Sequence, residues 1–265
     1  MSASARILPM TDPLTRFSSR SDNYAKFRPT YPAAVLEILK SHCGLNETSV
    51  VADVGSGTGI LSELFLKNGD SVFAIEPNTA MRQTAEDLLK QHAKLQSIDA
   101  TAEATTLETE SVDFITAAQA FHWFDRDKAK REFARILKPG GWVVLIWNER
   151  RLDSTAFLRA YEELLLRYGT DYEKVRHENV AGELAAFFAP ETFTLQALEN
   201  VQHFDFESLK GRLLSSSYAP DQDHPDFTAM LENLEEIFNA NQQDGIVSFE
   251  YETKVYYGHL GRSGL

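Results

Sequence analysis

The sequence predicts a doubly wound α/β fold: a mostly parallel, seven-stranded sheet with helices on both faces and a mainly helical insertion late in the chain. Between Ser49 and Asn148, short β-branched runs alternate with longer stretches of helical periodicity. This alternation is typical of βαβ units whose parallel strands are buried on both faces, and right-handed crossovers then cover both sides of the sheet. The chain has 265 residues, 43% of them hydrophobic, which is enough for one such domain.

The elements of the predicted core follow one another at short intervals. Pro32 can start a helix at Ala33–Lys40 before the core, and Pro139 with the two glycines after it stops the last core helix. The expected strands are Val50–Asp53, Ser71–Glu76, Leu95–Asp99, Val112–Ala117 and Trp142–Trp147, and the expected helices are Ile60–Lys67, Thr79–Lys90 and Lys128–Leu137.

After Asn148 the pattern becomes mainly helical, beginning with a strongly amphipathic stretch at Thr155–Tyr168. Further helices are expected at Glu183–Phe188, Glu207–Ser215 and Phe227–Asn239, with a strand at Thr194–Val201 and an alternating, antiparallel or edge strand at Ile246–Tyr257. We therefore expect one domain over 1–265: a lid and ligand-binding core at 22–148, an insertion or cap at 151–243, and a final strand at 246–259.

Composition narrows the classes of partner. The formal net charge is −13, which disfavours nucleic acid and anionic membranes because both would repel the chain. Cys43 is the only cysteine, so we expect neither an intrachain disulfide nor a cysteine-rich metal site. The start of the chain, Met1–Arg16, lacks the apolar core of a signal peptide, and no apolar stretch is long enough to span a membrane. We expect a cytoplasmic protein, monomer or homodimer.

The main chemical signal is the glycine-rich turn Gly55–Gly59, which lies between a predicted strand and a predicted helix. Glycines allow a ligand to approach the backbone closely, and the turn presents N–H groups at a helix N-terminus. The spacing G-x-G-x-G differs from the dinucleotide fingerprint G-x-G-x-x-G. Asp53, two positions before Gly55, would repel a pyrophosphate but suits a ligand with a cationic or hydrogen-bond-donating end, for example through a water on an ammonium group.

Two further positions fit a nucleoside ligand. Glu76 closes the second strand, where an acid in such sheets accepts hydrogen bonds from ribose hydroxyls; a helix-capping or solvated carboxylate is the alternative interpretation. The segment Thr101–Glu103 follows the third strand and can line an adenine pocket through its backbone.

With these motifs, the chain resembles the class I S-adenosylmethionine-dependent methyltransferases, within the methyltransferase type 11 or trans-aconitate methyltransferase-like group. The resemblance extends from Tyr24 to Asn148. It rests on Asp53–Gly59, Glu76–Asn78 with Met81, Val112–Ala117, Gln119–Phe124 and Leu137–Gly141.

The resemblance implies S-adenosylmethionine as cofactor, S-adenosylhomocysteine as product, and a Rossmann-like fold. It places the glycines along the methionine and ribose, Glu76 on the ribose hydroxyls, Met81 near the adenine, and Gln119 facing the methionine or sulfonium. The implied cofactor-binding residues are Tyr24, Asp53, Gly55, Ser56, Gly57, Thr58, Gly59, Glu76, Pro77, Met81, Thr101, Ala102, Glu103 and Gln119.

Two residues are candidates for catalysis. His122 follows the cofactor segment and could take a proton from an acceptor, although a hydrogen-bonded structural histidine fits the sequence equally well. Its neighbour Phe124 is expected in the core. In the family pattern Tyr24, Arg28 and Tyr31 form a lid, and Arg28 could bind an acceptor carboxylate or simply pair with a surface acid. Arg150 and Arg151 are lesser candidates for the same task.

We therefore expect methyl transfer to a small-molecule acceptor, with a carboxylate as the leading class. Such a transfer is an in-line displacement that needs positioning and desolvation but no metal. The alternatives are a non-catalytic S-adenosylmethionine-binding protein, a methyltransferase acting on RNA or protein, and a dinucleotide-dependent oxidoreductase, which the glycine spacing and Asp53 disfavour.

Overall fold

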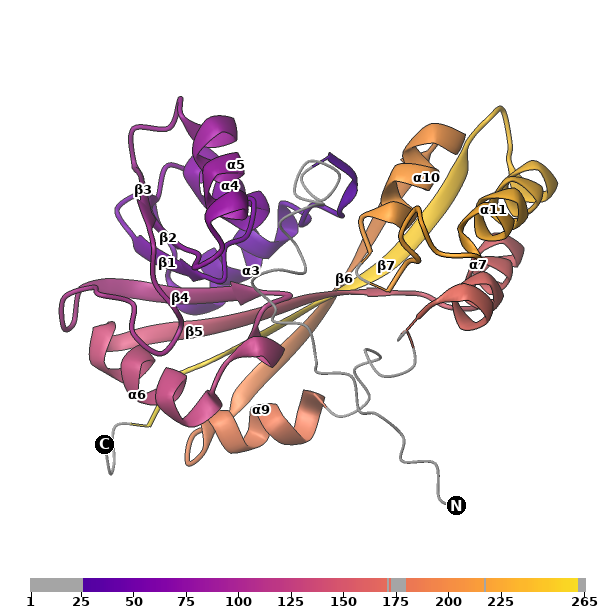
Figure 1. The fold of residues 1–265 in the computed structure, drawn as a ribbon. Helices are drawn as coiled ribbons and strands as arrows, with labels where there is room; N and C mark the ends of the chain where they lie inside the picture. The colour runs from indigo at the N-terminus through magenta and orange to yellow at the C-terminus, as the bar shows by residue number, and fades with distance from the viewer. Residues whose placement is uncertain (1–25, 171, 173–179, 217, 262–265) are drawn as a thin grey trace, which may run out of the picture.

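The computed structural model describes residues 26–170, 172, 180–216 and 218–261 (Figure 1). A seven-stranded sheet runs through it in the order β3-β2-β1-β4-β5-β7-β6. The first five strands in this order pair in parallel, β7 pairs antiparallel to β5, and β6 pairs antiparallel to β7. The predicted doubly wound, mostly parallel sheet is confirmed.

The elements follow the predicted order. The strands are β1 (Val50–Val54), β2 (Ser71–Ile75), β3 (Leu95–Ile98), β4 (Val112–Ala118), β5 (Leu137–Arg150), β6 (Phe193–Phe204) and β7 (Val247–Gly258). The helices are α3 (Ala34–Cys43), α4 (Ile60–Asn68), α5 (Thr79–Leu89), η1 (Phe121–Trp123), α6 (Arg126–Ile136), α7 (Ala156–Tyr168), α9 (Val180–Phe188), α10 (Phe206–Leu214) and α11 (Phe227–Asn241).

The strands β5 and β6 are longer than the sequence predicts, whereas β7 is displaced by one residue from the expected Ile246–Tyr257. β6 and β7 pair from Phe193 opposite Gly258 to Phe204 opposite Val247, so each strand extends as far as its partner. β5 begins before Pro139, where Leu137 pairs with Val112, and a register shift separates this pair from the next. Its far end at Arg150 continues beyond β4 because β7 supplies a partner there. The expected boundary at Trp147 was therefore wrong by three residues.

Three apolar clusters hold these layers together. One lies between the sheet and helices α6 and α9, and a second packs α3 and α4 against the other face. The third joins α7, α10 and α11 to the outer halves of β6 and β7, where Phe249 is fully buried. In Figure 1 these three helices lie at the far end of the β6–β7 pair, away from α4 and α5.

In the described ranges, no helix has both the length and the apolar character needed to cross a membrane. The same residues bring no group of three His, Cys, Asp or Glu side chains together as a metal site.

Candidate active site

The glycine-rich turn lies at the carboxyl end of β1, where the strand order reverses between β2 on one side and β4 on the other. Ligands of open α/β sheets bind at such a reversal. The backbone N–H groups of Gly55 and Ser56 donate to the carbonyl of Ile75, at 2.8 and 3.1 Å. The turn is thereby tied to the end of β2, so the two strand ends form one fixed surface.

Two glycines of the turn have different surroundings. Both have positive φ, +57° at Gly57 and +82° at Gly59. A Cβ on Gly59 would lie 2.6 Å from Leu89 Cδ1, so this glycine is needed for close packing of α5. A Cβ on Gly57 would meet nothing nearer than Met81 Cε at 4.0 Å. The open face of Gly57 is the place where a ligand can approach the backbone.

Glu76 faces this open backbone. Its Oε2 accepts a hydrogen bond from the Gly57 N–H at 2.9 Å, and its Oε1 accepts one from the Asn78 N–H at 2.8 Å. The cap of α5 is Asn78, whose Oδ1 accepts from the Met81 N–H, and Glu76 is only 8% exposed. Glu76 is therefore neither the N-cap residue of α5 nor a solvated carboxylate. Burial raises the pKa of Glu76, against the effect of its two backbone hydrogen bonds.

Asp53 lies beneath the turn and is 1% exposed. Its two oxygens accept hydrogen bonds from the hydroxyls of Ser62, at 2.6 Å, and Thr116, at 2.9 Å. Burial raises the pKa of Asp53 to about 6, although both hydroxyls act in the opposite direction. The carboxylate therefore braces β1 against α4 and β4.

A small hollow of about 30 Å³ opens beside the turn. Thr58 Oγ1 in its wall is buried without a hydrogen-bond partner in the described part of the chain. The hollow holds about one water, so a larger ligand would have to extend outwards from it. Its lining residues come from β1, the turn, α4, β4 and the N-terminal segment: Tyr31, Asp53, Gly55, Ser56, Gly57, Thr58, Ile60, Leu61 and Ala118.

The residues expected around the adenine lie on the β2–β3 side. Met81 is buried in the first turn of α5, directly behind Gly57, and Pro77 is half-buried between β2 and α5. Thr101 is exposed and Ala102 is buried, in a short bridge after β3. The Glu103 carboxylate accepts from the Asp125 N–H at 2.8 Å and so ties this loop to the start of α6.

Gln119 directly follows β4 and has a φ of +56°. A non-glycine residue in this region costs about 1–2 kcal/mol, and such strain often accompanies functional positions. Its N–H donates to the carbonyl of Ile146 and its Nε2 donates to the carbonyl of Asn148 at 3.0 Å. Gln119 is therefore held between the carboxyl ends of β4 and β5.

The aromatic segment after Gln119 divides between core and surface. Phe121 is 1% exposed and meets Phe187 at 4.8 Å between ring centroids, and Phe124 meets Phe121 edge-on. The expectation that Phe124 belongs to the core agrees with this packing. His122 is half-buried, with its ring 4.7 Å from that of Trp123.

The described N-terminal segment bridges the turn and the helices of the insertion. Tyr31 lines the hollow, whereas Arg28 Nη2 donates to the carbonyl of Ser215, just after α10, at 3.0 Å. Phe27 packs so tightly on α10 that a Cβ on Gly211 would lie 2.3 Å from its ring. Tyr24, the other expected lid residue, lies outside the described residues.

A set of amides connects these parts, and sequence reasoning missed it. Asn148 Nδ2 and Asn200 Nδ2 both donate to the Thr30 carbonyl, at 3.3 and 2.8 Å, and Gln202 Nε2 donates to the Arg28 carbonyl at 3.4 Å. These contacts join β5 and β6 to the N-terminal segment, residues more than a hundred positions apart. No local pattern in the sequence signals them.

Sequence reasoning also missed Arg212 on α10, which is 5% exposed. A signal was present: Arg212 lies three residues after Leu209 and one before Leu213, on the apolar face of the predicted helix. Arg151, in contrast, lies near Glu199 and Glu250 with its side chain 39% exposed.

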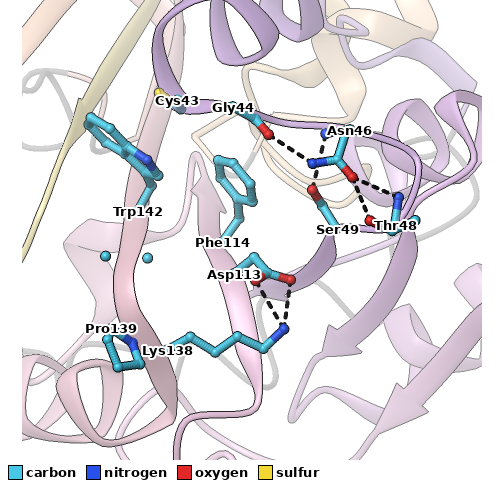
Figure 2. Close-up of a pocket in the computed structure, with 12 residues that line it drawn as sticks. Cys43, Gly44, Asn46, Thr48, Ser49, Asp113, Phe114, Lys138, Pro139 and Trp142 are labelled. Carbon is cyan, nitrogen blue, oxygen red and sulfur yellow. Dashed lines mark hydrogen bonds and ion pairs between the residues drawn. The ribbon is translucent and has the colours of Figure 1, made fainter.

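A larger hollow of about 270 Å³ lies at the opposite edge of the sheet, near the start of β4 and β5 (Figure 2). Lys138 Nζ binds both oxygens of Asp113 there, at 3.0 and 2.9 Å, and Asp113 also accepts from the Val50 N–H. Cys43 borders the hollow, and burial raises the pKa of its thiol to about 12, which disfavours the thiolate form. These polar groups satisfy one another and hold strand ends together.

The sequence matches a known protein family and several curated relatives. Residues 52–145 match the family described as a methyltransferase domain. An uncharacterised methyltransferase-like protein of Schizosaccharomyces pombe is 30% identical over 159 residues, covering 60% of this chain and 60% of that protein. An uncharacterised methyltransferase of Mycobacterium bovis is 34% identical over 153 residues, covering 58% and 60%. The chain thus spans about 60% of the length of these curated relatives.

Solved structures agree on the fold. A candidate type II methyltransferase from Anaeromyxobacter dehalogenans aligns with a TM-score of 0.64 at 22% identity, over 88% of this chain and 98% of that chain. The YcgJ protein from Bacillus subtilis aligns with a TM-score of 0.55 at 20% identity, over 87% and 99%. These solved structures share the fold of this chain, and residues 52–145 carry the match to the methyltransferase domain family.

Proposed function

We propose that this chain transfers the methyl group of S-adenosylmethionine to a small-molecule acceptor, with a carboxylate as the leading acceptor class. The observation that carries the proposal is the Glu76 carboxylate bound to the Gly57 N–H across the open face of the turn. A buried carboxylate with lone pairs to spare suits a ligand that presents two hydroxyl donors, as a ribose does. The open backbone beside it leaves room for that ligand.

In this proposal the cofactor follows the carboxyl ends of the strands. Its methionine and ribose pass along the turn, its ribose hydroxyls bind Glu76, and its adenine lies between the β2 and β3 ends. Gln119 faces the methionine or sulfonium, and Asp53 acts on the ammonium through a water. The residues proposed for the cofactor are Tyr24, Asp53, Gly55, Ser56, Gly57, Thr58, Gly59, Glu76, Pro77, Met81, Thr101, Ala102, Glu103 and Gln119.

In the proposed reaction the methyl group passes directly from sulfur to the acceptor, and no covalent bond to the protein forms. The acceptor atom forms a bond to the methyl carbon as the carbon–sulfur bond breaks, and S-adenosylhomocysteine leaves. The chain's residues hold the partners in line and exclude water. An ionised carboxylate needs no base, whereas a phenol or amine acceptor would give its proton to His122 in this proposal.

The experiment begins with calorimetric titration of S-adenosylmethionine, S-adenosylhomocysteine and, as a control, NAD. We expect micromolar binding of the first two and none of NAD. Methyl-labelled donor is then offered with small carboxylic acids, phenols and amines, and with RNA and a protein extract. Label in a small acid supports the proposal. Label only in RNA or protein overturns it, and tight cofactor binding without any transfer would favour a non-catalytic binding protein.

His122 is tested with the acceptor that proves active. If the acceptor carries an ionisable proton, we expect His122→Gln to lower kcat at least tenfold and to remove the acidic limb of the pH–rate profile. With a carboxylate acceptor, kcat should change less than threefold. A tenfold loss with a carboxylate acceptor would contradict the assigned role.

A further inference from the structure

The insertion encloses a group of positively charged and phenolic side chains around Phe249. The guanidinium carbon of Arg212 lies 5.5 Å from the centre of the Phe249 ring, and that of Arg150 lies 5.9 Å from it. Tyr161, on α7, packs on the same ring at 4.9 Å. Four separate elements thus bring these groups to one place: the end of β5, α7, α10 and β7.

The two arginines differ in how their charges are balanced. Arg150 forms an ion pair with Glu162, and both bind the Tyr172 hydroxyl. Arg212, in contrast, has no carboxylate partner among the residues that the structure describes. Its Nε donates to the Tyr251 hydroxyl at 3.2 Å and its Nη1 to Ser216 Oγ at 3.0 Å. A buried cation without a counter-charge is costly, by several kcal/mol.

Hydrogen-bond donors beside Arg212 are also left without partners. Arg150 Nη1 and the Tyr161 hydroxyl are both buried, and neither has a hydrogen-bond partner in the described segments. Buried donors of this kind are rare in folded proteins unless a ligand or water completes them. Both groups are donors, and Arg212 adds a positive charge; an oxyanion would satisfy all three.

The charges of this cluster act on a neighbouring side chain. Burial would raise the pKa of Tyr218, but the guanidinium groups of Arg212 and Arg28 outweigh it and hold that pKa below its ordinary value. The field of the two arginines therefore favours negative charge, although burial still raises the pKa values of Tyr161 and Tyr251 beside them. A neutral or cationic ligand would gain nothing from this field.

The cluster also connects to the methyl-transfer end of the sheet. The Tyr251 hydroxyl donates to Gln202 Oε1 at 3.0 Å, and Gln202 in turn binds the Arg28 carbonyl. Tyr251 pairs with Arg150, four residues past Ile146, the partner of the last residue of β4. Four residues of strand put this pair about 13 Å beyond the end of β4. The cluster therefore lies past the carboxyl edge of the sheet, the same edge as the glycine turn.

We propose that Arg212, with Arg150 and Tyr161 beside it, binds an oxyanion (a carboxylate or a phosphate) carried by the methyl acceptor. The proposal rests on the proposed function, because it assigns the substrate class of the same site. Arg212 is a specificity residue in this proposal: it holds the acceptor's anionic end and does not touch the transferred methyl. The acceptor is then an acid or a phosphate ester, and neutral analogues are excluded.

The test uses the full chain loaded with S-adenosylhomocysteine. Calorimetry with succinate, glutarate, citrate, trans-aconitate, benzoate and inorganic phosphate, at constant ionic strength, measures the anion site directly. We expect at least one of them to bind, at least thirtyfold more weakly to Arg212→Met and about tenfold more weakly to Arg212→Lys. Arg167→Gln, the matched loss of an exposed charge on α7, should bind as the unaltered chain does.

Stability provides a second readout. A buried arginine whose counter-charge comes from a ligand destabilises the ligand-free protein. Arg212→Met should therefore leave Tm unchanged or raise it. Binding by a carboxylate or by phosphate identifies the source of the oxyanion. The inference is overturned if no probe binds, if Arg212→Met binds as well as the unaltered chain, or if that variant loses stability as a structural arginine would. Cofactor binding in the same samples separates this failure from failure of the proposed function.

Discussion

The two sides of the sheet's carboxyl edge bury opposite charges and balance them differently. On the β1–β2 side, Asp53 and Glu76 each accept two hydrogen bonds from nearby groups, and Gly57 leaves the space beside Glu76 open. On the β5–β7 side, Arg212 is buried with phenol and hydroxyl partners but no described carboxylate. The buried carboxylates of the first side are hydrogen-bonded within the core, whereas the buried Arg212 charge of the second side has no described counter-charge.

This difference indicates which residues would recognise the methyl donor and which would recognise the acceptor. On the β1–β2 side, the two acids and the backbone N–H groups come from residues 53–78, and one donor to Asp53, Thr116, comes from β4. The β5–β7 side needs side chains from α7, α10, β5 and β7, whose positions depend on the whole insertion. We infer that donor binding is fixed by the core and acceptor choice by the insertion.

The largest effects are expected from two glycines of the same turn. Gly59→Ala should lower the free energy of unfolding by about 3 kcal/mol, because its Cβ strikes Leu89 and its φ is strained. Gly57→Ala carries only the φ penalty, about 1–2 kcal/mol, but its methyl fills the open face. We expect S-adenosylhomocysteine affinity to fall about a hundredfold in Gly57→Ala and less than threefold in Gly59→Ala.

Urea unfolding and calorimetry of both variants measure this contrast. Gly140→Ala is a control for strain alone, since its φ is +78° and nothing lies within 4 Å of the added Cβ. Equal losses of affinity in Gly57→Ala and Gly59→Ala would show that the turn is structural only and would undo the assignment of the open face.

The next largest effect concerns Asp53 and the pH dependence of the free energy of unfolding. Its native pKa, about 6, is above the ordinary value of 3.8, so the native state binds its proton more tightly than the unfolded state. The free energy of unfolding should therefore fall as pH rises from about 4 to 6, by roughly 3 kcal/mol in all. Asp53→Asn should flatten this part of the curve relative to the unaltered chain. Identical pH curves for the two proteins would contradict a raised pKa.

Much of the core and part of the site were predictable from the sequence, for a physical reason. The turn at Gly55–Gly59, the acid at Glu76 and the strands around them are signalled by residues close together in the chain. The predicted end of the fifth strand at Trp147 was wrong because strand pairing sets that boundary: β5 reaches Arg150 only because β7 lies beside it. Arg212 was hidden for the same reason, since the ring of Phe249 and the hydroxyl of Tyr251 reach it through the fold and not through the sequence.

Glu76→Gln should weaken binding of the cofactor and leave binding of the anion unchanged. Each carboxylate oxygen of Glu76 accepts one hydrogen bond, from the Gly57 N–H and from the Asn78 N–H. An amide has only one oxygen, so one of these N–H groups would face the NH₂ group of the glutamine. We expect cofactor affinity to fall about thirtyfold, equivalent to about 2 kcal/mol, while anion binding in the insertion is unchanged. Glu63→Gln, which changes an acid on α4 paired with Lys67, is the control. Loss of anion binding together with cofactor binding would show that the two sides are not separate.

The smallest effect tests the bridge between the two sides. Gly211 on α10 lies against the Phe27 ring so closely that an added Cβ would come within 2.3 Å of it. Gly211→Ala should push the N-terminal segment away from α10, lengthen the bond from Arg28 to the Ser215 carbonyl, and lower the free energy of unfolding by about 1 kcal/mol. We expect acceptor KM to rise about fivefold with cofactor affinity unchanged, and no effect of Glu207→Ala, an exposed change on the same helix. A rise in cofactor Kd instead would mean that the segment serves the donor side, through Tyr31 at the hollow beside the turn, more than the acceptor side.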